Sequence, residues 1–421
     1  MSQYIPRVID TLLEEYLETF GAVYIRGPKW CGKTTTAEQK AKSIVRFQDP
    51  KTGESNRMMA EIDPSLLLKG DNPRLLDEWQ VVPKIWDAVR LQVDDLKVEG
   101  LFILTGSTVP VDDDQRHSGT GRISRLTMRP MSLMESGESN GKVSLSSLFL
   151  GKAIEPGMLS SLAIPQLAYV MVRGGWPASI GKSERAAGLI AQEYLVSLAE
   201  SDVSRTTKTQ KNPERVHALL RSYARNVSTL ATNENIMRDI SENDMSFSES
   251  LYYEYLNALQ RLYVIEDVSA WNPSIRSKTA IRSRPKREFV DPSLAVAAIG
   301  LSSAMLLENL EYMGFVFETL CIRDLRVYSQ PLGGTVSYYH DRYDLECDCV
   351  LHLRDGRYAL IECKLGGSRI DEGAAHLLEL NSLIEQHGMK KPSFLMVLTA
   401  TNTAYARPDG VLVVPIGCLG I

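Results

Sequence analysis

The chain has 421 residues, of which 44% are hydrophobic and 24% are charged. This length and balance are typical of a folded protein of two or three domains, and they exclude bulk disorder. The 47 Lys and Arg residues stand against 52 Asp and Glu residues, and the net charge of −5 excludes a wholly basic protein that coats nucleic acid, but not a local basic surface.

Strands and helices alternate in the N-terminal segment, residues 1–150. Apolar residues at helical spacing predict a helix over 8–20, and a β-rich run at 22–26 predicts a strand. Further strands are expected at 74–77 and 101–105. This alternation favours an α/β fold with a parallel sheet, in which ligands bind at the carboxyl ends of the strands.

A complete G-x-x-x-x-G-K-[ST] motif lies between the first strand and a polar helix that starts near Thr34. In this P-loop motif the backbone N–H groups surround the phosphates, the lysine reaches the β- and γ-phosphates, and the hydroxyl binds Mg²⁺. Lys33 and Thr34 are the residues expected in these two roles. The sequence therefore predicts that ATP and Mg²⁺ bind here, with the nucleotide contacted by Gly27, Pro28, Lys29, Trp30, Cys31, Gly32, Lys33, Thr34 and Thr35.

An acidic pair, Asp77-Glu78, ends the strand expected at 74–77. An acid in this place of a P-loop ATPase holds Mg²⁺, and a following Glu polarises the attacking water. We therefore assign Asp77 to the metal and Glu78 to catalysis. The next strand ends near Thr105 and Ser107, either of which would sense the γ-phosphate.

Arginines follow a polar loop at 110–120. Arg122 and Arg125 are candidates for contact with the γ-phosphate, in the same chain or in a neighbouring subunit. We assign the catalytic role to Arg122. An arginine acting between subunits would require a homo-oligomer, which the sequence leaves open.

The middle segment, residues 151–300, is predicted to be mainly helical. Helices are expected at 185–200, 214–230, 234–240 and 247–262, followed by strand-like runs at 263–271 and 289–291. Helices that end in a two-stranded hairpin describe a winged-helix arrangement. The connecting loop has a run of basic residues that suits contact with the phosphate backbone of DNA, although a solvated charge run or a surface for an acidic partner is also open: Arg276, Lys278, Arg282, Arg284, Lys286 and Arg287.

The C-terminal segment, residues 301–421, combines a helix at 305–326 with strands at 345–353, 358–365 and 394–400 and a helix at 372–387. In the second strand Glu362 and Lys364 share one face, and a hairpin would bring Asp348 beside them. Together with Glu318 on the helix, these residues form the pattern of the restriction-endonuclease-like (D/E)-x-K site. There, carboxylates hold Mg²⁺ and a lysine activates water. Glu318, Asp348 and Glu362 are the expected metal ligands, with Glu362 and Lys364 catalytic.

Two features leave the nuclease interpretation open. Cys347 stands where the motif usually has proline, and a cross-strand salt bridge on a solvated face would use the same residue types. Cys347, Cys349 and Cys363 alternate onto apolar faces, which favours core packing over metal binding.

The apolar runs and the cysteines define the expected compartment. The longest apolar runs fall far below the roughly 18 to 20 residues that span a bilayer, and the acidic N-terminal stretch is no signal peptide. The six cysteines do not form a disulfide framework. We therefore expect a cytoplasmic protein that does not bind a membrane.

The ordered motifs resemble a large prokaryotic family of AAA+-like P-loop ATPases. These motifs are YIPR, GPKWCGKTT, LLDEWQ, FILTGST, GRISRLTMRPMSLMESG, GGWPASI, FVDPSLA and CDCVLHL…LIECK. The family carries a C-terminal domain of unknown function that combines a winged-helix part with a nuclease-like part. The resemblance implies ATP binding at Gly32, Lys33 and Thr34, with Asp77 and Glu78 as the acidic pair. It also implies a PD-(D/E)xK nuclease-like lobe.

The combined hypothesis is a Mg²⁺-dependent ATPase domain over 1–150, a helical and winged-helix-like region over 151–300, and a nuclease-like domain over 301–421. The ATPase would drive or gate a DNA-directed C-terminal half. A second hypothesis is an ATP-dependent binding switch whose nuclease-like lobe does not cleave. A third is an ATP-dependent Mg²⁺ nuclease.

Overall fold

The computed structural model describes residues 4–108, 118–155, 157–207, 209–242, 244, 246–271 and 284–421. The chain divides into two compact units. We call Met1–Pro130, Ser201–Gln210 and Glu254–Val264 the N-terminal unit, and Met131–Glu200, Lys211–Tyr253 and Ile265–Ile421 the C-terminal unit. The division into three domains at 150 and 300 stays a prediction.

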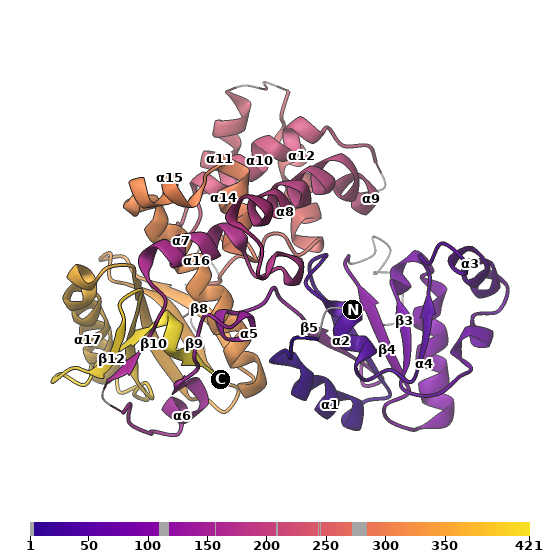
Figure 1. Cartoon of the computed structure of the whole chain (residues 1–421), viewed down its shortest axis with the longest axis horizontal. Helices are drawn as coiled ribbons and strands as arrows, with labels where there is room; N and C mark the ends of the chain where they lie inside the picture. Colours follow the sequence, from indigo (N-terminus) through magenta and orange to yellow (C-terminus); the bar gives the residue numbers. More distant parts are fainter. Residues whose placement is uncertain are drawn as a thin grey trace. The chain divides into compact units, whose positions relative to one another are not determined.

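A parallel sheet organises the N-terminal unit, as the alternation of elements predicts (Figure 1). Its described strands lie in the order β2-β3-β4-β1-β5, and every neighbouring pair is parallel. The strands expected at 22–26, 74–77 and 101–105 are confirmed within one residue, and two further strands complete the sheet. The bounds are Ala22–Arg26 (β1), Ser43–Arg46 (β2), Arg74–Asp77 (β3), Phe102–Gly106 (β4) and Ile123–Thr127 (β5).

Three helices of this unit, α2, α3 and α4, lie between consecutive strands of the sheet along the chain. The expected helix over 8–20 is confirmed as α1, and the helix expected from Thr34 begins one residue earlier. A 3₁₀ turn, Trp79–Val81, follows β3 directly. The polar loop at 110–120 lies mostly outside the described residues. The helix bounds are Ile9–Thr19 (α1), Lys33–Glu38 (α2), Gly53–Ile62 (α3), Lys84–Leu96 (α4) and Val203–Thr207 (α9).

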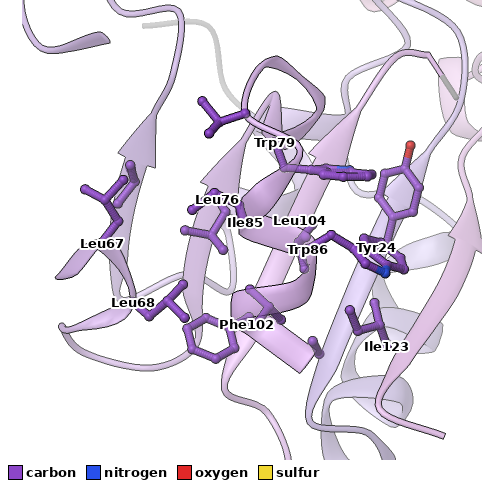
Figure 2. Packing of buried hydrophobic residues seen from close by; sticks show 14 of the residues in the cluster. Tyr24, Leu67, Leu68, Leu76, Trp79, Ile85, Trp86, Phe102, Leu104 and Ile123 are labelled. Atoms are coloured by element: carbon purple, nitrogen blue, oxygen red, sulfur yellow. The ribbon is translucent and has the colours of Figure 1, made fainter. Parts of the chain in front are cut away.

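Three large rings anchor the turn after β3 to the sheet (Figure 2). The ring of Tyr24 meets the rings of Trp79 and Trp86 edge to face, with centroids 5.5 and 5.8 Å apart. All three residues are at most 4% exposed. Because aromatic rings bury large apolar areas in defined geometries, this packing fixes the backbone that follows the acidic pair at the end of β3.

Helices make up the first part of the C-terminal unit. Those expected at 185–200, 214–230, 234–240 and 247–262 are confirmed, with ends shifted by up to five residues. The helix expected at 305–326 is broken at Asn309, whose side chain caps the second of its two helices. The bounds are Ile164–Arg173 (α7), Glu184–Ser197 (α8), Pro213–Arg225 (α10), Asn233–Ser241 (α11), Glu249–Arg261 (α12, which extends into the N-terminal unit), Pro292–Ile299 (α14), Ser303–Glu308 (α15) and Leu310–Ser329 (α16). The short helices Leu133–Ser136 (α5) and Leu145–Phe149 (α6) precede them.

Among the described residues, the strand-like run after α12 forms two isolated antiparallel bridges with the segment 286–289. These join Ile265 to Phe289 and Val268 to Lys286. The order of three helices and an antiparallel return agrees with the predicted connectivity, but the winged-helix arrangement stays a prediction.

A mixed sheet forms the second part of the C-terminal unit (Figure 1). Its described strands lie in the order β7-β12-β13-β11-β10-β9-β8, and the hairpin expected between 345–353 and 358–365 is confirmed. The helix expected at 372–387 is α17, Ile370–Gln386, and its apolar side packs on β10 and β11. The strands are Met158–Leu159 (β7), Thr335–His340 (β8), Glu346–His352 (β9), Tyr358–Lys364 (β10), Leu395–Thr399 (β11), Thr403–Ala406 (β12) and Leu412–Pro415 (β13); Val143–Ser144 (β6) and Leu419–Gly420 (β14) pair separately. Among the described residues, no helix combines the length and the apolar character needed to cross a bilayer.

Candidate functional site

The P-loop motif forms a tight turn between β1 and α2. Gly27 has a φ of 151° and Gly32 a φ of 102°, backbone angles that residues with a Cβ rarely adopt. A Cβ on Gly27 would lie only 2.0 Å from the carbonyl oxygen of Met128. Both glycines are therefore required for the loop to fold back on itself as a phosphate loop must.

Lys33 lies inside this loop. Its side chain is buried, and its Nζ donates hydrogen bonds to the carbonyl oxygens of Gly27 and Pro28, at 2.9 and 2.6 Å. The ammonium group is thus held at the centre of the turn, where it would meet phosphate oxygens. Trp30 and Thr35 are exposed at the rim, whereas Cys31 is buried.

Thr34 and Asp77 meet at the carboxyl edge of the sheet. The hydroxyl of Thr34 donates to Oδ1 of Asp77 at 2.7 Å, and the hydroxyl of Thr105 donates to the same atom at 2.7 Å. The register of β3 with β4 pairs Asp77 with Thr105 and so explains the second contact. A carboxylate beside a hydroxyl is the hard oxygen set that Mg²⁺ prefers, so these residues fit the predicted ion.

Glu78 begins the turn after β3 with a φ of 58°. Its Oε2 accepts hydrogen bonds from Nε2 of Gln80 and, at 3.4 Å, from the hydroxyl of Ser107. Its backbone N–H points to the hydroxyl of Thr105. The residues expected to sense the γ-phosphate, Thr105 and Ser107, therefore contact the acidic pair.

Two contacts of the loop were not predicted. The guanidinium of Arg7 is buried and donates to the carbonyl oxygens of Cys31 and Arg129, both at 2.8 Å. Lys29 pairs with Asp202, which belongs to the same unit. The YIPR run contains Arg7, but its link to the loop depends on a tertiary contact that sequence spacing does not reveal.

Arg122 is far from the phosphate loop of its own chain. It precedes β5, and its carbonyl oxygen accepts a hydrogen bond from the N–H of Ala22, at the start of β1. The loop leaves β1 at its other end, four residues or about 13 Å away. The side chain of Arg122 instead pairs with Asp94 at 2.6 Å. The structure therefore does not bring Arg122 to the loop of its own chain, and its role at a γ-phosphate stays a prediction.

The carboxylates and the lysine predicted in the C-terminal segment do come together. Nζ of Lys364 lies 2.6 Å from Oε2 of Glu362 and 3.8 Å from Oδ2 of Asp348. A second lysine, Lys286, pairs with Glu318 on α16 and lies 3.5 Å from Oδ1 of Asp348. None of these five side chains is more than 11% exposed, so we call them the buried charge cluster.

The metal site predicted in this cluster is not formed. Glu318, Asp348 and Glu362 were the expected ligands, but among the described residues no group of three His, Cys, Asp or Glu side chains is arranged to hold a metal ion. A lysine stands among these carboxylates instead, because the ammonium of Lys286 contacts both Glu318 and Asp348. The sequence analysis placed Lys286 in a basic loop and did not predict this position, because lysine normally marks a solvated surface.

The structure also corrects the prediction that the basic loop presents all of its charges to DNA. Lys286 and Arg287 are 7% and 3% exposed, and Arg287 pairs with Asp267. These two residues therefore offer no free charge to a DNA backbone. Arg284 is exposed, whereas Arg276, Lys278 and Arg282 lie outside the described residues.

Burial and charge act against each other in the cluster. Burial raises the pKa of Glu318 to about 8 in spite of Lys286. Burial also opposes ionisation of Asp348, but Lys286 and Lys364 outweigh it and lower the pKa of that carboxyl. Cys347, Cys349 and Cys363 are buried and unpaired, in agreement with core packing.

Glu288 provides a test of these electrostatics. Burial raises its pKa from 4.5 to about 7, although Ser228 donates a hydrogen bond to it at 2.8 Å. A raised pKa in the folded state means that stability is fully present below pH 4.5 and is lost as the pH rises through 7. The loss amounts to about 3 kcal/mol.

We expect Glu288→Gln to remove this pH dependence, because the amide oxygen still accepts from Ser228 and carries no charge. Urea titrations at pH 4.5 and pH 8 measure it. The variant should gain about 3 kcal/mol of unfolding free energy over the wild type between these pH values. Parallel pH profiles for the two proteins would contradict the expectation.

Three segments of the chain match three different protein-family models. Residues 19–136 match the profile described as "AAA domain", so the N-terminal part of the chain is a P-loop ATPase domain of the AAA type. The whole chain is thus a multidomain α/β protein with an ATPase fold at its N-terminal end. Residues 313–419 match the domain of unknown function DUF4143, and residues 164–304 match the domain of unknown function DUF8612.

Individual relatives are distant. Uncharacterized proteins of Mycobacterium tuberculosis and Mycobacterium bovis are each 21% identical over 357 residues, which cover 82% of this chain and 71% of theirs. Among solved structures, a Walker-type ATPase of Pyrococcus abyssi is 15% identical with a TM-score of 0.42, over 69% of this chain and 94% of that one. The replication initiator DnaA bound to AMPPCP and single-stranded DNA is 14% identical with a TM-score of 0.27, over 60% and 86%.

Proposed function

We propose that this chain binds ATP with Mg²⁺ and hydrolyses it at the N-terminal unit. The observation that carries the proposal is the meeting of a folded P-loop with the acidic end of β3, where Thr34 donates to Asp77 at 2.7 Å. The match of residues 19–136 to the AAA domain supports the same activity.

The residues at the P-loop and at the end of β3 would have different roles in ATP binding and hydrolysis. The ammonium of Lys33 would exchange the carbonyls of Gly27 and Pro28 for oxygens of the β- and γ-phosphates, which have more negative charge to offer. Thr34 and Asp77 would hold Mg²⁺, which supplies charge neutralisation on the phosphates. Glu78 would turn from Gln80 and Ser107 to orient the attacking water as a general base.

The Mg²⁺ assignment predicts the behaviour of Thr34→Val. This variant keeps the size of the side chain but loses the oxygen, so we expect turnover to fall by about 10²-fold, with more Mg²⁺ needed for half-maximal rate. Phosphate release measured against Mg²⁺ concentration tests this. Thr19→Val is the control, because Thr19 is exposed on α1 and bonds only to its own helix in the described contacts. An unchanged Mg²⁺ dependence in Thr34→Val would contradict the assignment.

The second candidate function is a binding switch, in which ATP selects one arrangement for partner binding and the C-terminal lobe does not cleave. The absence of a formed metal group among the described residues of that lobe favours this function over an ATP-dependent nuclease. DNA remains the partner to test first, through ATP turnover measured with and without duplex DNA. A DNA-directed protein predicts a change in turnover, and equal rates would point to another partner.

A further inference from the structure

The buried charge cluster places two ammonium groups among three carboxylates. Lys364 bridges Glu362 and Asp348, and Lys286 bridges Asp348 and Glu318, so basic and acidic side chains alternate from β10 to α16. Buried charges are tolerated only when they are paired, and Lys286 supplies such a partner to Glu318 and Asp348 without an added ion.

Lys286 is fixed in place by its backbone as well as its side chain. Its N–H and its carbonyl oxygen both bond to Val268, each at 2.9 Å. The hydroxyl of Tyr338 donates to the carbonyl oxygen of Arg284, and Arg287 on the other side pairs with Asp267. The segment 284–287 is therefore anchored on both flanks, and its backbone holds the Cα of Lys286 within reach of the carboxylates.

One carboxylate oxygen of the buried charge cluster, on Glu362, lacks a hydrogen-bond partner in the described part of the chain. Glu362 is fully buried, yet its Oε1 has no hydrogen-bond partner among the residues that the structure describes. A buried carboxylate oxygen without a partner is costly, and it is the kind of atom that would coordinate a cation. The ammonium of Lys364 lies 2.6 Å from the other oxygen, Oε2, and Nδ1 of His376 lies 4.0 Å from it.

We propose that the ammonium of Lys286 takes the place of a divalent cation between Glu318 and Asp348, and that removing it creates a divalent-cation site from Glu318, Asp348 and Glu362. With Lys286 in place, the wild-type C-terminal lobe would be stable without a metal ion and would not cut nucleic acid. This inference concerns the C-terminal unit alone and does not depend on ATP hydrolysis.

Binding of Mn²⁺ to the full chain tests the proposal, with free Mn²⁺ followed by electron paramagnetic resonance. Lys286→Met keeps an unbranched side chain of similar length and removes the charge. We expect this variant to bind one more Mn²⁺ per chain than the wild type, with a Kd of about 10⁻⁴ M or tighter. The gain should disappear in the double variant Lys286→Met/Glu318→Gln, which separates this ion from any Mn²⁺ bound at Asp77.

Arg284→Met is the matched control, because Arg284 is an exposed cation two residues away and lies outside the cluster. It should bind as much Mn²⁺ as the wild type. If Lys286→Met folds only when Mn²⁺ is present, seen as a thermal transition that appears on adding the ion, that result supports the proposal as well. No additional Mn²⁺ in a folded Lys286→Met would overturn it.

If Lys286→Met does not fold under any condition, Mn²⁺ binding by the wild type provides a second, independent test. Wild-type Mn²⁺ binding that is unchanged by Glu318→Gln supports the proposal. Wild-type Mn²⁺ binding that Glu318→Gln removes, or DNA cleavage by the wild type that Glu362→Gln abolishes, would show that the cluster holds a metal in spite of Lys286.

Discussion

Lys33→Ala is expected to reduce ATP turnover by about 10³-fold or more. The ammonium of Lys33 is buried at the centre of the loop and bonds there to the backbone carbonyls of Gly27 and Pro28. Removing a preorganised positive charge from the place where phosphate charge develops costs about 10²- to 10³-fold in rate by itself, and weaker nucleotide binding adds to this loss. Steady-state phosphate release measures the effect.

Lys40→Ala is the control for Lys33→Ala. Lys40 follows α2 closely, but its ammonium pairs with Glu14 on the surface, so its loss should leave turnover within about twofold of the wild type. Comparable losses in both variants would indicate a general effect on folding. Full activity in Lys33→Ala would show that the loop does not bind the phosphates.

The second large effect is expected for Glu78→Gln, which should slow hydrolysis by about 10²-fold or more while ATP still binds. The amide keeps the shape of the side chain and can still accept a hydrogen bond from Ser107, but it cannot take a proton from water. Single-turnover hydrolysis and equilibrium nucleotide binding, measured on the same variant, separate the two effects.

Glu61→Gln is the matched control, because Glu61 forms an exposed ion pair with Lys84. Its turnover should match the wild type. Rapid hydrolysis by Glu78→Gln would mean that another group positions the water, and the acidic residue would then serve only to hold the turn after β3.

The ATPase part of the fold could be predicted because its signals are local. Eight consecutive positions specify the phosphate loop, and short apolar runs mark the buried strands on each side of it. Asp77 could be placed because it ends one of these strands, and in a parallel sheet all strands end at one edge. The structure confirms its contact with Thr34.

The positions of Arg122 and Lys286 differ from those expected from the sequence, because strand register and contacts between distant residues decide where these side chains lie. Arg122 follows the loop region in sequence, but its pairing with the start of β1 puts it at the wrong end of the sheet. Lys286 belongs to a run of basic residues that looks solvated, yet its backbone bridge to Val268 directs it to carboxylates 32 and 62 residues further along the chain. No local pattern reports such contacts.

Nucleotide binding by the N-terminal unit is measured by titrating the purified chain with ATP in the presence of Mg²⁺ and following the heat released by calorimetry. We expect one nucleotide site per chain in the wild type and much weaker uptake of ATP in Lys33→Ala. A wild-type protein that is folded and yet takes up no ATP would contradict this expectation.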